Sequence, residues 1–151
     1  MRANREWWLY HHPTRADDLA NSVAFGDARF AGSTGAIRLN RPVVGMAGVP
    51  SGKGYWVFTT KGRVLTFGDA THFGDMAGKP LNAPVLDSIV TPSGKGYYMV
   101  AGDGGIFSFG DAKFYGSTGA IRLNQPIVGM AATPFGNGYW LVAADGGIFS
   151  F

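Results

Sequence analysis

The sequence predicts an all-β fold assembled from copies of one short unit. With 24 glycines and 8 prolines in 151 residues and only 15% charged residues, the composition disfavours a helical bundle. A four-residue motif recurs at a fixed spacing, and short apolar runs alternate with turn residues inside each period. These three observations together indicate a repeat protein made of small antiparallel sheets.

The repeat is 42 residues long. Phe-Gly-Asp-Ala occurs at Phe25–Ala28, Phe67–Ala70 and Phe109–Ala112, and Phe151 stands in the same register. The stretch GSTGAIRLN at residues 32–40 returns unchanged at residues 116–124, whereas the middle copy at residues 74–82 reads GDMAGKPLN. The outer copies therefore resemble each other more than either resembles the middle one.

Each period contains four expected strands. In the last copies these are Ile127–Thr133, Tyr139–Ala143 and Gly147–Phe151, and the fourth strand, taken from the preceding copy, is Ala112–Gly116. Asp145-Gly146 between two apolar runs indicates a tight hairpin with positive φ at both central positions. The unit is thus predicted to be a four-stranded antiparallel meander.

The expected strands are apolar on both faces, as Tyr139–Ala143 shows. A sheet with two apolar faces has to be covered on both sides, and radial stacking of four-stranded sheets is the β-propeller solution. A 42-residue unit matches the length of a propeller blade, and the small residues Gly129, Ala131 and Ala132 suit a first strand near the central axis. The alternative is a β-trefoil, which also uses three repeats of this length.

The strands add up to about 3.5 blades. The N-terminal portion supplies three strands, two full blades follow at residues 42–76 and 84–117, and the C-terminal portion supplies three more. Propellers close with four to eight blades, so something has to complete the ring. A homodimer gives seven blades; the other options are a longer repeat array, or a strained four-blade ring in which Trp7–Tyr10 shares a blade with the C-terminal strands.

Two domain-level segments are expected: residues 1–21, a divergent strand with a long loop, and residues 22–151, the repeat domain. The first ten residues do not have the apolar run of a signal peptide, and no run of 18 apolar residues predicts a membrane span. The net charge is +3 without a block of like charges, which gives little support to nucleic-acid binding. There is no cysteine, and the redox compartment stays open.

The phrases GYWLVAADGGIFSF, FGDAKFYGS and PIVGMAATP resemble the tandem repeats of many secreted or surface proteins of actinobacteria, which often lie beside cell-wall hydrolase or adhesin-like domains. The resemblance covers essentially residues 22–151. It implies a propeller-like repeat domain used for binding or display, outside the cell or at its surface. It carries over no catalytic residue.

Catalysis and metal binding are not expected. His11 and His12 are adjacent and point to opposite sides of an extended chain, and no nucleophile, zinc or phosphate motif occurs. The repeated acids Asp27, Asp69 and Asp111 suggest either calcium ligands or residues that hydrogen-bond their own turns, and the second explanation needs fewer partners. We therefore expect no cofactor and no enzyme activity.

The aromatic residues of the second strand are candidates for a sugar platform. Trp56, Tyr98 and Trp140 recur at one strand position, where they either fill the space between blades or stack on pyranose rings.

Meander geometry gathers another set of polar residues on one rim, because the loop after the fourth strand and the turn between the second and third strands emerge on the same side. These residues are Arg38, Asn40, Arg122 and Asn124, which would donate hydrogen bonds to hydroxyl or carboxylate groups or merely face water. Asp87 stands where the outer copies have Gly45 and Gly129, which predicts an acid facing the central channel or a neighbouring blade.

The function expected from the sequence is that of a non-catalytic module that recognises a glycan or a cell-wall polymer at the cell surface. The alternative is a structural or protein-interaction propeller, in which a half-ring is completed by a second chain.

Overall fold

The computed structural model describes residues 25–35, 39 and 42–151. The chain divides into two compact units, Met1–Asn40 and Arg41–Phe151. The domain boundary expected after residue 21, the strand expected at Trp7–Tyr10, and Arg38 and Asn40 lie outside the described residues. No helix long and apolar enough to cross a membrane occurs in the described part of the chain.

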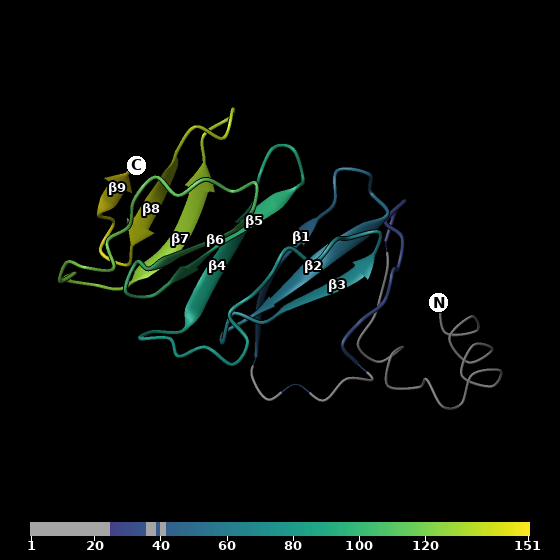
Figure 1. Ribbon diagram of the computed structural model, residues 1–151, viewed down its shortest axis with the longest axis horizontal. Helices are drawn as coiled ribbons and strands as arrows, with labels where there is room; N and C mark the ends of the chain where they lie inside the picture. The colour runs from purple at the N-terminus through teal and green to yellow at the C-terminus, as the bar shows by residue number, and fades with distance from the viewer. Residues whose placement is uncertain (1–24, 36–38, 40–41) are drawn as a thin grey trace. The chain divides into compact units, whose positions relative to one another are not determined.

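The second unit contains three separate antiparallel sheets of three strands each (Figure 1). In every sheet the strands pair in chain order, with the middle strand bonded to both neighbours. The first sheet is β1 (Val43–Gly48), β2 (Gly54–Thr59) and β3 (Val64–Gly68); the second is β4 (Val85–Val90), β5 (Gly96–Ala101) and β6 (Ile106–Gly110); the third is β7 (Ile127–Ala132), β8 (Tyr139–Ala143) and β9 (Ile148–Ser150).

The 42-residue period of the sequence reappears in the geometry of the sheets. β7, β8 and β9 agree with the first three expected strands to within a residue at each end. The first strand pair of each sheet also has an irregularity at the same place, between Val43 and Gly45, Val85 and Asp87, and Ile127 and Gly129. The all-β class and the repeated antiparallel unit are confirmed.

The prediction of a fourth strand in each unit is wrong. Residues 112–116 form no ladder, because their backbone groups bind aromatic side chains instead of a neighbouring strand. The Lys113 carbonyl accepts from the Tyr98 hydroxyl at 2.7 Å, and Tyr139 of the next sheet donates to the Gly116 carbonyl at 2.6 Å. The same hydroxyl accepts from the Tyr115 amide at 3.0 Å. The segment is therefore a strap between two sheets, and each blade has three strands.

The strap before the second sheet repeats this arrangement. The Trp56 indole donates to the Thr71 carbonyl at 2.7 Å, and the Tyr97 hydroxyl donates to the Gly74 carbonyl at 2.6 Å. Tyr97 also accepts from the Phe73 amide at 3.0 Å. One aromatic residue of the strap's own sheet and one tyrosine of the following sheet thus hold each of these two straps.

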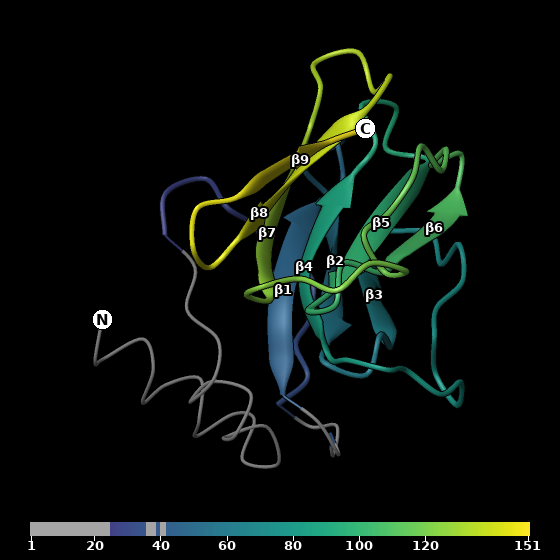
Figure 2. The same cartoon turned by 90° about the vertical axis from the view of Figure 1, so that its left-hand side faces the viewer.

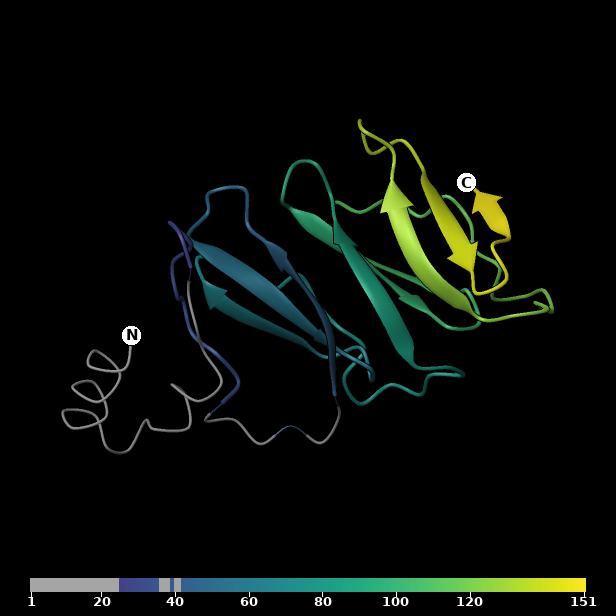
Figure 3. The same ribbon diagram turned by 180° about the vertical axis from the view of Figure 1, so that it is seen from behind.

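The three sheets stack face to face in chain order (Figures 1 and 3), and two apolar clusters fill the junctions. Their first strands, β1, β4 and β7, run side by side (Figure 2). Every residue of β5 is buried, as expected for a strand between two covered faces. The propeller itself, with its radial stacking and closed ring, stays a prediction. A β-trefoil barrel would need strands of different repeats to pair in one ladder, and the described strands pair only within their own sheets.

The hairpin turn at Asp145-Gly146 differs from the expected one. Gly146 has φ 87°, while no described residue other than glycine has positive φ. The Ala143 amide bonds the Gly147 carbonyl, so the turn is the longer type that closes with a single left-handed glycine. At the equivalent Gly104 there is a second reason for glycine, since a Cβ would collide with the Thr118 side chain of the following strap.

Candidate binding grooves on the proline rim

Three prolines mark one rim of the stacked sheets. Pro42, Pro84 and Pro126 each precede the first strand of a sheet, and we call this side the proline rim. Backbone hydrogen bonds link its parts: the Thr60 amide donates to the Pro42 carbonyl at 3.0 Å, and the Thr60 carbonyl accepts from the Val85 amide at 2.8 Å. The turn of one sheet is thereby fixed to the first strand of its own sheet and to the first strand of the next.

The same pair of backbone hydrogen bonds recurs one repeat later. The Gly102 amide donates to the Pro84 carbonyl at 3.0 Å, and the Gly102 carbonyl accepts from the Ile127 amide at 2.8 Å. These bonds join sheets that are separate ladders elsewhere. The rim is consequently a rigid support for the side chains that line it.

Two grooves lie on the proline rim, one over each junction between sheets. The first has a volume of about 470 Å³ and the second about 550 Å³. They share Ala83 and Pro84, so the two grooves are contiguous. The first is lined by Pro42, Thr60, Lys61, Leu81, Asn82, Ala83 and Pro84; the second is lined by Ala83, Pro84, Leu86, Gly102, Asp103, Ile121, Leu123, Asn124, Gln125 and Pro126.

The two grooves are formed by equivalent positions of successive repeats. Leu81 and Asn82 of the first correspond to Leu123 and Asn124 of the second, 42 positions later. They differ in charge, because Lys61 of the first groove is replaced by Asp103 in the second. The Asp103 carboxylate accepts a hydrogen bond from the Gly105 amide at 3.0 Å, and this bond fixes the carboxylate within the hairpin turn.

Of the rim residues predicted from the sequence, Asn124 is exposed and lines the second groove. Arg122 is exposed but does not line either groove. Lys61, Asn82 and the prolines were not among the binding residues predicted from the sequence. A signal for them is present: Leu-Asn-x-Pro survives in the middle copy, at residues 81–84, where most of the surrounding GSTGAIRLN stretch is lost.

The proposed sugar platform is corrected at two of its three positions. Trp56 is 1% exposed and Tyr98 is 4% exposed, since each ring packs against the next sheet. Tyr97 meets Trp56 edge-on at 5.8 Å between ring centroids, and Tyr139 meets Tyr98 in the same way at 5.3 Å. Neither ring offers a face to a sugar, whereas Trp140 is 42% exposed.

Asp87 holds two adjacent first strands together. One carboxylate oxygen accepts from the Ser88 amide at 2.8 Å and the other from the Met130 amide of β7 at 3.0 Å. The side chain is partly buried and faces the neighbouring blade, the second of its two expected orientations. Asp87 lies at the irregularity of β4, where its two hydrogen bonds give it a structural role. It lines neither groove.

Two of the repeated acids, Asp69 and Asp111, accept hydrogen bonds from hydroxyls of the hairpin loop between the first two strands of their own sheets. Asp69 accepts from the Ser51 hydroxyl at 2.6 Å, and Asp111 accepts from the hydroxyls of Ser93 and Thr91. The Ser93 hydrogen bond is the main cause that lowers the pKa of Asp111. In the described residues no group of three histidines or acids lies close enough to hold a metal ion. Asp111 also lines a cavity of about 260 Å³, on the side of the sheets opposite the proline rim.

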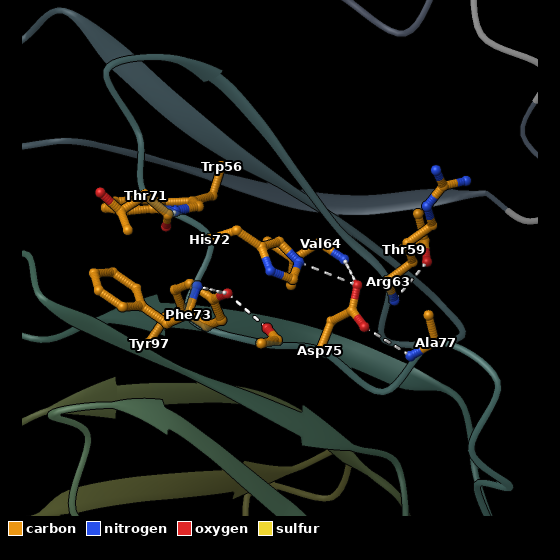
Figure 4. Close-up of polar contacts among 11 residues, drawn as sticks. Trp56, Thr59, Arg63, Val64, Thr71, His72, Phe73, Asp75, Ala77 and Tyr97 are labelled. Atoms are coloured by element: carbon orange, nitrogen blue, oxygen red, sulfur yellow. Dashed lines mark hydrogen bonds and ion pairs between the residues drawn. The ribbon is translucent and has the colours of Figure 1, made fainter.

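A polar cluster surrounds Asp75 in the middle strap (Figure 4). Asp75 accepts from the Val64 amide at 3.1 Å, from the Ala77 amide at 3.0 Å and from His72 at 3.4 Å. Burial raises the pKa of Asp75, but these hydrogen bonds outweigh it and lower the pKa below its ordinary value of 3.8. Asp75 stands where the outer copies have Ser33 and Ser117, whose hydroxyls accept from the amide two residues on.

A scan of protein-family models finds no match to this sequence, and a search of curated proteins finds none either. The function is therefore argued from the grooves themselves.

Proposed function

We propose that this protein is a non-catalytic binding module that holds a glycan or a cell-wall polymer along the proline rim, outside the cell or at its surface. The observation that carries the proposal is the contiguity of two equivalent grooves, which meet at Ala83 and Pro84. A repeating ligand that spans both junctions would meet a leucine, an asparagine and rim prolines in each groove, with Lys61 in the first groove and Asp103 in the second as the charged residue. A compact small molecule would use only one.

The lining of the grooves suits a carbohydrate. Leu81 and Leu123 with the rim prolines offer apolar surface to the C–H faces of a sugar, and the amides of Asn82 and Asn124 donate to and accept from hydroxyls. Neither groove is lined by an aromatic ring. Each single contact is consequently weak, and affinity comes from occupying successive grooves with one chain of sugars.

Charge extends the proposal to acidic polymers. Lys61 lines the first groove, and Arg122 is exposed beside the second. Arg38 and Asn40 stand at the equivalent positions of the first copy, which lie outside the described residues. The cell-surface location rests on the resemblance of the repeats to those of secreted and surface proteins.

The test is co-sedimentation with insoluble peptidoglycan and with insoluble neutral polysaccharides, followed by calorimetry on soluble fragments. The variant Asn82→Ala combined with Asn124→Ala is expected to weaken binding about tenfold, because each lost hydrogen bond contributes about 1 kcal/mol and part of the loss is relieved by water. Arg38→Ala combined with Arg122→Ala is expected to weaken binding to the acidic polymer and to leave binding to a neutral one unchanged.

The matched control is Lys53→Ala combined with Lys95→Ala, two exposed positions in the hairpin loops of the opposite rim. This pair should bind as the unaltered protein does. Absence of binding to every polymer, or an equal loss in the control pair, would remove the proposal.

A further inference from the structure

We propose that the two grooves of the proline rim select opposite charges: the first groove takes a carboxylate of the polymer, and the second groove takes a free amine. The inference rests on the proposed function, because it names the class of polymer that these same grooves hold. That class is a polysaccharide that carries carboxylates and free amines on one chain. The side chains that carry the argument all lie between residues 42 and 126.

The backbone around the two grooves is the same. The Lys79 amide donates to the Met76 carbonyl at 3.0 Å, and the Ile121 amide donates to the Thr118 carbonyl at 3.0 Å. Lys79 and Ile121 are 42 positions apart, so they occupy the same place in successive straps. The grooves therefore differ in their side chains and not in the backbone that supports them.

The first groove is surrounded by cations. Lys61 lines it and is exposed. Arg63 is exposed in the same turn, and Lys79 is exposed two residues before Leu81, which lines the groove. The acid of this strap, Asp75, already accepts hydrogen bonds from two backbone amides. A carboxylate that enters the first groove consequently finds charged donors for its oxygens.

The second groove has lost these cations. Their three positions are taken, one repeat later, by Asp103, Gly105 and Ile121. Asp103 and Ile121 line the groove, and Ile121 is 56% exposed. Arg122 is exposed but does not line the groove. The Asp103 carboxylate accepts one hydrogen bond, from the Gly105 amide, and an ionised carboxylate has about four acceptor sites. An ammonium group therefore meets a charged acceptor in this groove.

The contiguity of the grooves turns two preferences into one requirement. Because both grooves include Ala83 and Pro84, one chain of sugars that follows the rim meets Lys61 and Asp103 in succession. A polymer with carboxylates alone is attracted in the first groove and repelled in the second, and a polymer with amines alone has the opposite difficulty. Only a chain with both groups is favoured in both grooves.

The experiment compares three soluble oligosaccharides that share one sugar backbone. Chitosan oligomers carry amines, carboxymethylated chitin oligomers carry carboxylates, and carboxymethylated chitosan oligomers carry both. Calorimetry at about pH 6, where amino-sugar amines are largely protonated and carboxylates are ionised, gives the dissociation constants. The oligomer with both groups should bind about threefold more tightly than either of the others, as expected for exposed ion pairs. This preference should disappear at about 0.5 M salt.

Two variants assign the preferences to their grooves. Lys61→Ala combined with Lys79→Ala should weaken the binding of carboxymethylated chitin about fivefold more than the binding of chitosan. Asp103→Asn should weaken the binding of chitosan about threefold more than the binding of carboxymethylated chitin. The asparagine oxygen can still accept from the Gly105 amide, so the turn is kept.

Each variant has a matched control. Lys53→Ala combined with Lys95→Ala removes two lysines from the opposite rim, and Asp145→Asn makes the same change as Asp103→Asn in the turn of the third sheet. These residues line neither groove, so the order of the three oligomers should stay that of the unaltered chain. Circular dichroism and thermal melting of each variant show that it is folded.

The possible results separate this inference from the proposed function. If the three oligomers bind equally and Asn82→Ala combined with Asn124→Ala weakens all of them, the rim binds glycans and charge selection is overturned. Tightest binding of carboxymethylated chitin would also overturn it, since the rim would then prefer anions alone. If none of the three binds while peptidoglycan or a neutral polysaccharide does, only the charge selection is lost; if no polymer binds, both proposals are lost.

Discussion

Trp56 and Trp140 occupy the same position of the same strand in two copies of one repeat, and the first is 1% exposed while the second is 42% exposed. Their partners on the ladder are also equivalent, since Trp56 pairs with Ala47 and Trp140 with Ala131. The residue and its local structure are therefore the same in both places. Within residues 42–151, Trp56 is covered by a strap and by a following sheet, whereas Trp140 is not, and this covering decides whether the ring belongs to the core.

This difference indicates how the stability of the unit is distributed. In stacked repeats the free energy of unfolding is approximately a sum of a term for each repeat and a term for each junction. Here the junction term includes contacts between buried aromatic rings: Tyr97 meets Trp56 and Phe58 edge-on, at 5.8 Å and 5.4 Å between ring centroids. A sheet without a neighbour retains its ladder and loses these contacts.

The largest effect is expected from truncating the two tryptophans. Trp56→Ala removes a buried ring and the indole hydrogen bond to Thr71, and should lower the free energy of unfolding by about 3–5 kcal/mol. Trp140→Ala should lower it by less than about 1 kcal/mol, because its ring is partly in water. Urea denaturation measures both, at a concentration where ultracentrifugation shows a single chain.

Equal losses for the two tryptophan variants would contradict the comparison. They would mean that the ladder, and not the neighbouring sheet, determines what this position contributes. Tyr98→Ala gives a further check, because Tyr98 is 4% exposed at the second junction and should behave as Trp56 does.

A smaller effect is expected from the tyrosine hydroxyls that hold the straps. Tyr97→Phe leaves the ring in place and removes the bonds to the Gly74 carbonyl and the Phe73 amide. Two partly buried backbone groups then lose a partner, which should lower the free energy of unfolding by about 1–3 kcal/mol. Tyr139→Phe removes the same two types of bond at the second junction and should have a similar effect.

The double variant sharpens this prediction. The two tyrosines hold different straps, so the losses should add to within about 0.5 kcal/mol if each junction contributes independently. Burial raises the pKa of both hydroxyls, and they stay protonated donors across the neutral range. Denaturation curves of the two single variants and the double variant at pH 7 decide the point; strong non-additivity would show that the junctions are coupled.

The strands of the repeat could be predicted from the sequence, and the strap could not. The run Tyr139–Ala143 is apolar on both of its faces, which is typical of a strand in a stacked sheet, and its bounds are those of β8. The segment Ala112–Gly116 contains two adjacent aromatic residues, Phe114 and Tyr115, which also favour a strand. It forms no strand because Tyr98 and Tyr139, which lie on two different sheets, bind its backbone, and a short window of sequence does not show that competition.

The grooves could be predicted only in part, for a similar reason. Asn124 was identified, since polar residues in a long loop are visible in one copy of the repeat. Lys61 and Asn82 line one groove although 21 positions separate them, because a turn of the first sheet meets the strap that enters the second. The site belongs to a pair of repeats, and no single repeat contains it.

The smallest effect is expected from acid, at the cluster around Asp75. Hydrogen bonds from Val64, Ala77 and His72 lower the pKa of Asp75 in the folded chain below 3.8, in spite of burial. The stabilisation is therefore complete above about pH 4 and is lost as the pH falls through the folded pKa. Asp75→Asn should lower the free energy of unfolding by about 1 kcal/mol at pH 7, and this difference should shrink below pH 4.

The control for the acid prediction is Asp145→Asn, because Asp145 is exposed and its one hydrogen bond, from the Gly147 amide, can also be accepted by an asparagine oxygen. Melting temperatures of the three proteins between pH 2 and pH 7 separate the two residues. The melting temperature of the Asp145 variant should follow that of the unaltered protein at every pH. The melting temperature of the Asp75 variant should be lower at pH 7 and should approach that of the unaltered protein in acid. A gap that stays constant down to pH 2 would show that Asp75 acts by the shape of its side chain, since only a charged acceptor loses its advantage over asparagine when protons bind.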